Sequence, residues 1–197
     1  MQNGAPLILA SSSPRPLALL RQVAVIPDRV AVPAVDETPL ARELPRDHVL
    51  RLAMAKAADV AALPDAAGAY VLAADTVVAC GRRILGKADD SVAAERFLRL
   101  LTGRRHRVYT GVAVVAPDGR RAVRAVMTMV RFKRLGEREI AAYLASREWR
   151  GKAGGYAIQG RAEAFVPSIS GSWSNVVGLP LATALELLGG LGWRPQP

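Results

Sequence analysis

The chain has 197 residues, a length that suits one domain or two small lobes sharing a core. Half of its residues are apolar (51%) and 22% are charged, a composition that excludes intrinsic disorder. The formal net charge of +10 admits nucleic acid, an anionic surface or phosphorylated small molecules as partners, and a general bias toward arginine explains it equally well.

The sequence has no feature that predicts a membrane or an export pathway. No apolar run reaches the ~18 residues that a membrane helix needs. The first ten residues lack the basic region of a signal peptide, and three serines follow them directly. The single cysteine, Cys80, excludes an intramolecular disulfide and a cysteine-based zinc finger. We therefore expect a cytoplasmic protein with no membrane partner.

Short apolar segments alternate with helical patterns, which is typical of an α/β fold with a single domain over residues 1–197. Asp47 is expected to cap the long second helix, and the turns are expected at Gly81 and at Pro117-Asp118-Gly119. The elements predicted in chain order are a strand at 7–10, a helix at 16–23, a strand at 30–35, a helix at 47–63, strands at 71–79 and 83–85, a helix at 91–101, strands at 108–116 and 122–133, and helices at 137–146 and 180–188.

The first candidate site is the serine-rich loop between the first strand and the first helix. Loop and helix-start N–H groups favour an anion at such a position. Ser11 adds a hydroxyl, and Arg15 adds a planar guanidinium that fits phosphate. An ordinary serine-capped helix start explains the same residues.

Three further charged positions interrupt apolar patterns. Asp36 and Glu37 follow a predicted strand and offer the oxygen ligands that Mg²⁺ prefers, although a solvated loop would look the same. Lys56 lies seven residues after Val49 on the apolar stripe of its helix, so it needs a partner or a pocket unless it extends to solvent. Asp75 lies inside the most apolar strand, where a general base or a metal ligand explains it better than a strand break does.

The remaining candidates are weaker when each is taken alone. Lys87 follows Gly86 after a predicted strand. The glycine-rich segment 152–160 could approach a ligand closely, and its Gln159 offers a donor and an acceptor to a base edge. Flexible-loop composition explains that segment equally well. His48 and His106 have no metal-ligand spacing, so we expect them to be surface or structural residues.

Together these segments resemble the Maf family, within the superfamily of Maf and inosine-triphosphatase-like house-cleaning pyrophosphatases, over residues 7–188. The matching segments, specific in their order and spacing, are 9–15 (LASSSPR), 35–37 (VDE), 52–53 with 56–57 (LA and KA), 74–76 (ADT), 86–87 (GK), 101–104 (LTGR) with His106, 152–160 (KAGGYAIQG) and 176–180 (VVGLP).

The resemblance implies a mixed, bent β-sheet flanked by helices, with two lobes around a cleft. It implies hydrolysis of nucleoside triphosphates to the monophosphate and pyrophosphate, with Asp75 as the base that activates water. It implies a divalent cation, Mg²⁺ or Mn²⁺, near Glu37 and Asp75. Ser11, Lys56 and Lys87 would hold the phosphates.

The resemblance also predicts the substrate from three positions. In this family arginine, threonine and glutamine accompany the branch that acts on dTTP and UTP, and here they are Arg15, Thr76 and Gln159. The branch resembling 7-methyl-GTP pyrophosphatase has tryptophan, glutamine and glutamate there. We therefore expect a dTTP/UTP pyrophosphatase, which could also take modified pyrimidine triphosphates.

One departure from the family pattern concerns phosphate binding. The family has a second arginine after the Ser-Pro pair, and this chain has Pro16. A charge-assisted hydrogen bond contributes on the order of 1.5–3 kcal/mol, so its loss would raise KM by roughly 10- to 100-fold unless Arg150 or Arg161 replaces it.

Two other functions stay open at this point. A nucleic-acid-binding protein with a weakened catalytic site would use the positive charge, but the chain has no helix-turn-helix pattern and only 5% aromatic residues. An inhibitor of septum formation, the role behind the family's name, would act by protein contacts. The resemblance also allows a homodimer.

Overall fold

The computed structural model describes residues 4–195. Its elements in chain order are β1 (Leu7–Ala10), α1 (Pro14–Gln22), β2 (Arg29–Ala31), α2 (Pro45–Ala61), the 3-10 helix η1 (Pro64–Ala66), β3 (Tyr70–Cys80), β4 (Arg83–Leu85), α3 (Ser91–Leu101), β5 (Arg105–Val115), β6 (Arg121–Arg131), α4 (Glu137–Ser146), the 3-10 helix η2 (Arg161–Phe165), β7 (Ser168–Ser170), α5 (Trp173–Val177) and α6 (Leu181–Gly190). Within the described residues, no helix has both the length and the hydropathy needed to cross a membrane.

The strands form a seven-stranded mixed sheet in the order β2-β1-β3-β5-β6-β7, and β4 pairs with β3. β1 runs parallel to β2 and β3, whereas β4 and β7 run antiparallel to β3 and β6. The α/β class and the mixed sheet flanked by helices are confirmed. The bend of the sheet and the cleft stay predictions.

The described residues divide into two compact units. The first unit holds residues 4–75, 110–126 and 178–195, and the second unit holds residues 76–109 and 127–177. The long strands β3, β5 and β6 pass from one unit into the other, so each contributes one half to either unit.

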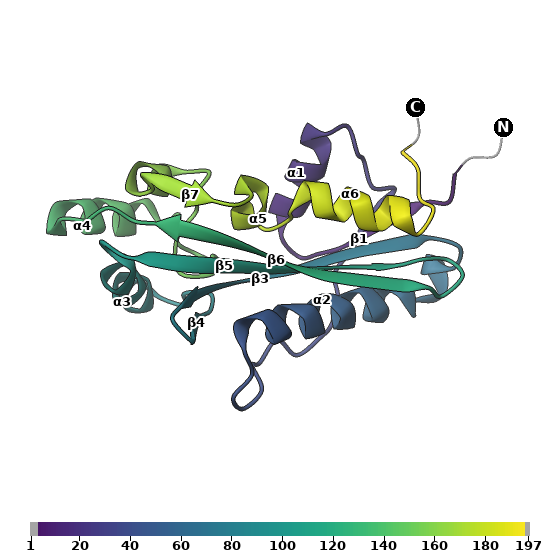
Figure 1. Cartoon of the computed structure of the whole chain (residues 1–197), viewed down its shortest axis with the longest axis horizontal. Helices are drawn as coiled ribbons and strands as arrows, with labels where there is room; N and C mark the ends of the chain where they lie inside the picture. Colours follow the sequence, from purple (N-terminus) through teal and green to yellow (C-terminus); the bar gives the residue numbers. More distant parts are fainter. Residues whose placement is uncertain (1–3, 196–197) are drawn as a thin grey trace. The chain divides into compact units, whose positions relative to one another are not determined.

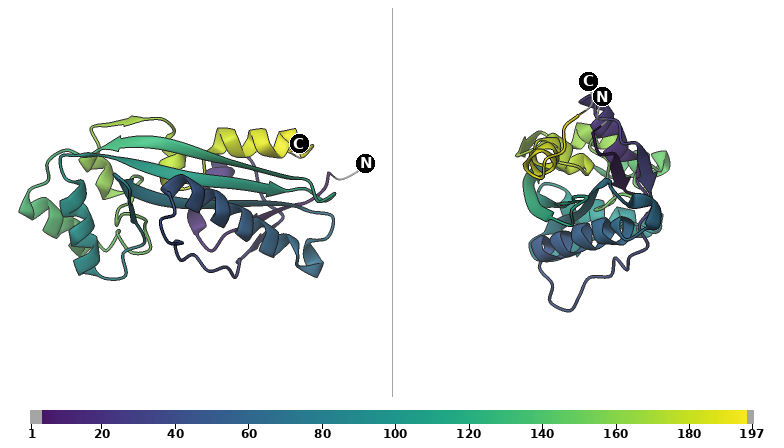
Figure 2. Two further views of the ribbon diagram at one scale, coloured as in Figure 1. Left: turned by 60° about the horizontal axis from the view of Figure 1, so that its bottom comes forward. Right: turned by 90° about the vertical axis from the view of Figure 1, so that its right-hand side faces the viewer.

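In the first unit, α2 and α6 lie on opposite faces of the sheet (Figures 1 and 2). The α2 face is packed with small and β-branched residues from β1, α2, η1, β3, β5 and the turn before β3, which form one buried cluster: Ile8, Ala10, Ala53, Ala57, Val60, Ala66, Ala69, Val71, Ala73, Ala113 and Val115. Gly111 of β5 marks the closest approach, because a Cβ there would lie 2.0 Å from the carbonyl oxygen of Val49. Small residues thus allow α2 to lie directly on the strands.

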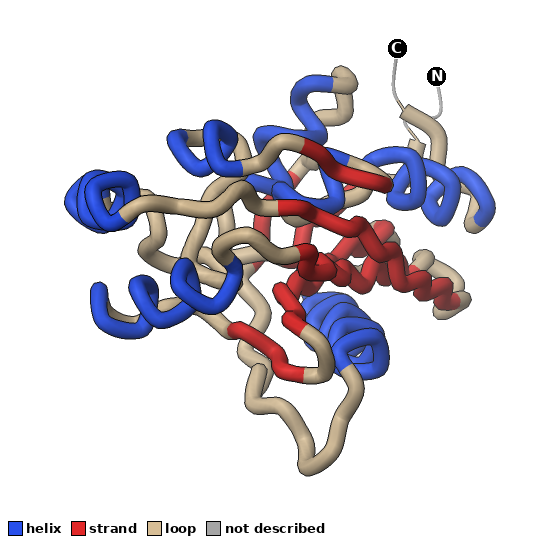
Figure 3. Tube along the Cα trace, turned by 60° about the vertical axis from the view of Figure 1, so that its left-hand side comes forward, coloured by secondary structure: helices blue, strands red, loops and turns tan. Residues whose placement is uncertain are grey.

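Two sequence predictions in this unit are wrong. The strand expected at 30–35 ends at Ala31, because Pro33 cannot donate to a ladder, and residues 32–44 form a long loop without regular structure (Figure 3). The second helix begins at Pro45 with Leu44 as its N-cap. Asp47 therefore lies within the first turn, where its charge favours the helix dipole.

The second unit has an aromatic core. Phe132 makes edge-to-face ring contacts with His106, Tyr156 and Phe165, and Phe165 makes another with Tyr143. The elements that sequence patterns did not predict are mostly here: η2, β7 and α5 have three to five residues each. Segments this short carry too few repeats of a hydrophobic period to be recognised.

Candidate functional site

Asp75 and Lys56 face each other because of the periodicity of the strand and the helix that carry them. Val71 and Ala73 of β3 point into the α2 cluster, and Asp75 follows them on the same face. On α2, Lys56 follows the buried Ala53 by three residues and precedes the buried Val60 by four, so it lies on the same face of the helix and points toward β3. Both side chains are buried, with relative exposures of 8% for each residue.

The Lys56 ammonium links two carboxylates. Its Nζ donates to Oδ1 of Asp75 at 2.6 Å and lies 2.6 Å from Oε1 of Glu37. The side chain of Glu37 is 39% exposed, against 9% for Asp75, so the cluster runs from the buried strand toward solvent. The structure thus brings three predicted site residues together, and the buried carboxylate that the sequence left without a partner is paired.

Burial alone would lower the pKa of Lys56, but Asp75 and Glu37 together raise that pKa above its ordinary value. Lys56 therefore stays an ammonium at neutral pH. Two carboxyl groups, which can accept a proton or ligate a cation, therefore meet at one ammonium.

The loop that carries Glu37 is fastened to α2. The Asp59 carboxylate accepts from the Ala34 amide at 2.8 Å, on one side of Glu37. On the other side, the Arg51 guanidinium donates to the Thr38 carbonyl at 3.2 Å. Loop residues 32–44 are therefore held in place by side chains from successive turns of the helix.

Glu43 closes the far end of this loop. Its carboxylate accepts two hydrogen bonds from Arg51, at 2.6 and 2.8 Å, and one from the Leu40 amide, and it lies 2.8 Å from Nδ1 of His48. The hydrogen bonds from Arg51 are the main cause that lowers the pKa of Glu43 to about 2. His48 is buried, which agrees with the structural role expected for it. The signal missed in the sequence was polar spacing along α2, at residues 48, 51, 56 and 59.

The serine-rich loop lies beside this cluster within the first unit. β1 pairs with β3 so that Ala10 lies opposite Ala73, two residues before Asp75. Ser11 follows β1 directly and is half-buried, and its Oγ accepts from the Ser13 amide at 3.1 Å. The loop therefore starts near the middle of β3, which carries Asp75.

Arg15 lies in the first turn of α1. The Ser13 hydroxyl caps this helix by accepting from the Arg15 amide at 3.3 Å and from its Nε at 3.2 Å. Burial lowers the pKa of the half-buried Arg15 guanidinium. Pro16 is buried in the same turn, where it packs rather than offering a donor. Both proposed substitutes for the missing arginine have other contacts: Arg150 stacks over Trp149, and Arg161 lies 3.6 Å from Glu148.

The other three predicted residues belong to the second unit. Thr76 is half-buried on β3, and Lys87 and Gln159 are exposed. Lys87 forms an isolated bridge with Ala153, and the Gly154 amide donates to the Leu85 and Gly86 carbonyls. The Gly86-Lys87 segment thus lies against the glycine-rich segment 152–160. Gly154 has a φ of +67°, and its Cβ would lie 2.9 Å from Val78, so the close approach requires glycine here.

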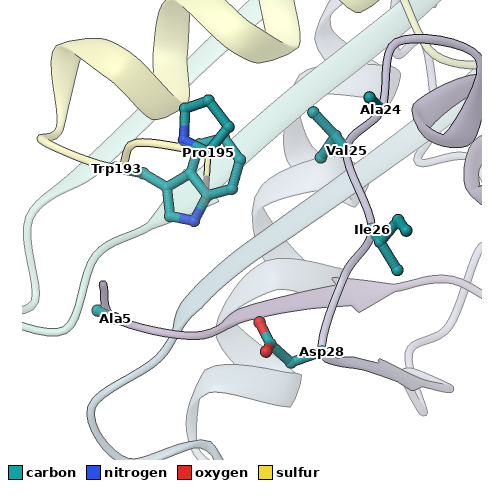
Figure 4. Close-up of a pocket in the computed structure, with 7 residues that line it drawn as sticks. All are labelled: Ala5, Ala24, Val25, Ile26, Asp28, Trp193 and Pro195. Carbon is teal, nitrogen blue, oxygen red and sulfur yellow. The ribbon is translucent and has the colours of Figure 1, made fainter. Parts of the chain in front are cut away.

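A separate pocket of about 350 Å³ in the first unit contains none of the predicted site residues (Figure 4). Its lining is Ala5, Ala24, Val25, Ile26, Asp28, Trp193 and Pro195. Among the described residues that line it, Asp28 has the one charged side chain, and Oδ2 of that carboxylate accepts from the Leu7 amide at 2.7 Å. The pocket lacks the cationic groups that a triphosphate requires.

Within residues 4–195, no group of three or more His, Cys, Asp and Glu side chains is arranged to hold a metal. A site with fewer protein ligands is compatible with Mg²⁺, which keeps several waters and binds through one or two carboxylates plus substrate phosphates. Glu37 and Asp75 each place a carboxylate oxygen 2.6 Å from the Lys56 Nζ, so two ligands of the kind that Mg²⁺ prefers meet at one place. These residues fit a divalent cation.

The sequence matches a family and closely similar proteins over almost its whole length. The family model described as Maf-like protein matches residues 6–191. A protein of Caulobacter vibrioides named dTTP/UTP pyrophosphatase is 57% identical, covering 99% of this chain and 100% of its own. Proteins with the same name from Paramagnetospirillum magneticum and Hyphomonas neptunium are 59% and 57% identical, covering 97% and 98% of this chain and 100% of theirs.

Proposed function

We propose, because the chain belongs to the Maf-like protein family, that it is a nucleoside triphosphate pyrophosphatase that hydrolyses dTTP and UTP to the monophosphate and pyrophosphate. The membership confirms the resemblance that the sequence motifs predicted. The structural observation behind the proposal is the buried Lys56 ammonium between Asp75 and Glu37, since such a cluster supplies a base and a phosphate ligand at one place.

Asp75 is the proposed catalytic residue. Lys56 donates to its Oδ1, which leaves Oδ2 as the oxygen that takes a proton from water. The hydroxide that forms attacks the α-phosphorus, and the bond between that phosphorus and the bridging oxygen breaks. Pyrophosphate leaves with the electron pair of that bond, so the charges around the leaving group must be positive.

Ser11, Lys56 and Lys87 are the proposed phosphate ligands. The Ser11 hydroxyl donates to the Ser13 carbonyl at 3.3 Å and would donate to a phosphate oxygen instead when substrate binds. Lys56 would stabilise the negative charge that develops as the α-phosphorus is attacked. Lys87 would add a second ammonium.

A divalent cation, Mg²⁺ or Mn²⁺, is the proposed cofactor, held by Glu37 and Asp75. When bound, the cation would neutralise phosphate charge and polarise the bond to the leaving group. Glu37 is suited to this ligand role because the loop on both sides of it is fixed to α2 by Asp59 and Arg51.

Arg15, Thr76 and Gln159 are the proposed determinants for the base. All three match the residues that accompany dTTP and UTP in this family. Their chemistry suits a pyrimidine edge, because a glutamine amide presents one donor and one acceptor side by side. Modified pyrimidine triphosphates keep that edge and are included in the proposal.

The organisation of the protein is part of the same proposal. Residues 1–197 form one Maf-like domain with two lobes, and the protein acts in the cytoplasm as a house-cleaning enzyme. Its partner is a nucleoside triphosphate, and a homodimer is compatible with the family. Neither nucleic acid nor a membrane is proposed as a partner.

The test is pyrophosphate release from a panel of nucleoside triphosphates, deoxynucleoside triphosphates and modified pyrimidine forms, with Mg²⁺, with Mn²⁺ and with EDTA. We expect metal-dependent release that is fastest with dTTP and UTP. Release from no triphosphate would overturn the proposal. Release from purine triphosphates in preference to dTTP and UTP would overturn the roles of Arg15, Thr76 and Gln159 while leaving the reaction intact.

A further inference from the structure

Gln159 is an exposed side chain on a segment that is otherwise buried. Tyr156, Ala157 and Ile158 before it have exposures of 3–6%, with Tyr156 at 4%. A side chain that identifies a base edge by a paired donor and acceptor must be held within a few tenths of an ångström. Since Gln159 lies in a turn just before η2, its position depends on what fixes the backbone on either side.

On the near side, His106 of β5 holds Tyr156. The His106 Nε2 lies 2.8 Å from the Tyr156 hydroxyl, and the two rings meet edge to face with centroids 5.4 Å apart. His106 is 1% exposed. Burial lowers the pKa of His106 to about 4 and raises that of Tyr156, so at neutral pH both are uncharged and share one hydrogen bond.

The next residue is fixed by a second tyrosine. The Tyr143 hydroxyl of α4 accepts from the Ala157 amide at 3.0 Å, and Tyr143 itself is 2% exposed. Two consecutive residues before Gln159 are therefore held: Tyr156 by its hydroxyl against His106, and Ala157 by its amide against Tyr143.

On the far side, Glu148 fixes the backbone after Gln159. Its Oε2 accepts from the Arg161 amide at 2.8 Å. A Cβ on Gly160 would lie 2.2 Å from that same oxygen, so the contact requires a glycine between Gln159 and Arg161. The turn that carries Gln159 is thus held at both ends.

We propose that His106, Tyr143 and Tyr156 are positioning residues that set the discrimination between nucleobases by fixing the backbone of Gln159. This inference rests on the proposed function, because it assumes that Gln159 contacts the base. It assigns no contact with substrate to the three residues themselves. They act through one side chain, so their loss affects recognition of the base more than the chemical step.

The experiment compares Tyr156→Phe and Tyr143→Phe with the unaltered protein, using kcat and KM for UTP and CTP, which differ at the edge that an amide can distinguish. Each variant deletes one hydroxyl and keeps the ring. Loss of one neutral hydrogen bond changes an equilibrium or rate ratio by up to about tenfold. We therefore expect the ratio of kcat/KM for UTP to kcat/KM for CTP to fall by about three- to tenfold. The kcat for UTP should change by less than about threefold, since no catalytic group is touched.

Tyr70→Phe is the matched control. Tyr70 of the first unit is also buried, and its hydroxyl donates to the Leu191 carbonyl at 3.1 Å. It should lose a similar amount of thermal stability with an unchanged UTP/CTP ratio. Stability losses in all three variants without any change in the ratio would overturn the inference, since the tyrosines would then be structural only. If Tyr156→Phe does not fold, Tyr143→Phe decides by the same criterion.

A double-mutant cycle separates this inference from the proposed function. In the Gln159→Ala background, Tyr156→Phe should have no further effect on the UTP/CTP ratio, because the residue through which it acts is gone. Additive effects of the two substitutions would overturn the inference. Failure of the unaltered protein to release pyrophosphate from UTP would instead overturn the proposed function.

Discussion

The charged cluster of Glu37, Lys56 and Asp75 in the first unit and the neutral cluster of His106, Tyr143 and Tyr156 in the second are both largely buried, yet they are stabilised in opposite ways. In the charged cluster, one ammonium offsets two carboxylates at 2.6 Å. In the neutral cluster, burial itself keeps each group uncharged, and single hydrogen bonds of 2.8–3.0 Å fix the geometry.

The difference matches the tasks proposed for the two regions. Chemistry at phosphorus needs charges that are already in place, and Lys56 and Asp75 hold them on a regular helix and a regular strand. Recognition of a base needs direction rather than charge, and neutral hydrogen bonds supply it on a loop. Removing a charge from Lys56 or Asp75 should therefore lower turnover strongly, whereas removing a neutral hydrogen bond should change preference or stability.

The largest effect is expected for Asp75→Asn. The amide can still accept from Lys56 but cannot take a proton from water, and general-base contributions are about 10²- to 10⁴-fold, so kcat should fall by about 10³-fold or more. Pyrophosphate release with dTTP measures the loss, and thermal unfolding checks that the fold is kept. Turnover within tenfold of the unaltered protein would remove Asp75 from its catalytic role.

Lys56→Gln should have the next largest effect. It leaves Glu37 and Asp75 facing each other without their shared cation, and it deletes a charge-assisted contact to phosphate. A contact of this kind is worth about 1.5–3 kcal/mol, so kcat/KM for dTTP should fall by about 10- to 100-fold. Lys133→Gln is the matched control, because Lys133 also pairs with a glutamate, Glu139, at 2.7 Å but lies exposed in the second unit. Equal losses in both variants would contradict a special role for Lys56.

Much of the charged region could be predicted from the sequence. Period-2 and period-3.6 patterns placed Asp75 inside an apolar strand and Lys56 on an apolar stripe, and a buried charge must have a partner. The sequence could not identify that partner, since it lies 19 residues away on another element. The fastening of the Glu37 loop by Asp59, Arg51 and Glu43 also depends on three-dimensional distance, which no local pattern encodes.

Less of the neutral region could be predicted. His106 was expected to be surface or structural, and its burial agrees with the structural role. Its bond to Tyr156 spans 50 residues, and that of Tyr143 to Ala157 spans 14. Tyrosines and glycines in a loop are compatible with many conformations, so composition alone left segment 152–160 undecided. The short elements β7 and α5 were missed because each spans little more than one period of its hydrophobic pattern.

The free energy of unfolding should depend on pH through His106 of the neutral cluster. The pKa of His106 is lowered from 6.5 to about 4 in the folded protein, so between these values the unfolded chain binds a proton that the folded protein does not. Stability should therefore decrease as the pH falls from about 6.5 to about 4, by up to about 1.4 kcal/mol per pH unit. Urea unfolding at pH 7, 6 and 5 measures this slope. His106→Gln should flatten it, and an unchanged slope in that variant would assign the acid sensitivity to other groups.

The smallest effect is expected for Glu43→Gln, at the end of the loop 32–44 that carries Glu37. The pKa of Glu43 is lowered from 4.5 to about 2. The ionised carboxylate therefore contributes fully to the stability of the folded protein above about pH 4.5, and this contribution is lost as the pH falls toward 2. A partly exposed Arg51 limits the gain, so we expect the variant to lose about 1 kcal/mol at pH 7. The difference between variant and unaltered protein should shrink between pH 4.5 and 2 in urea unfolding. Asp118→Asn is the control, since that exposed carboxylate pairs with Arg120 only two residues away.

The same two variants test whether the loop positions Glu37. If Glu43→Gln weakens Mn²⁺ binding while Asp118→Asn does not, the loop that Glu43 closes also holds Glu37 in position for a metal. Unchanged Mn²⁺ affinity would show that the contacts of Lys56 and Asp59 are enough to hold it.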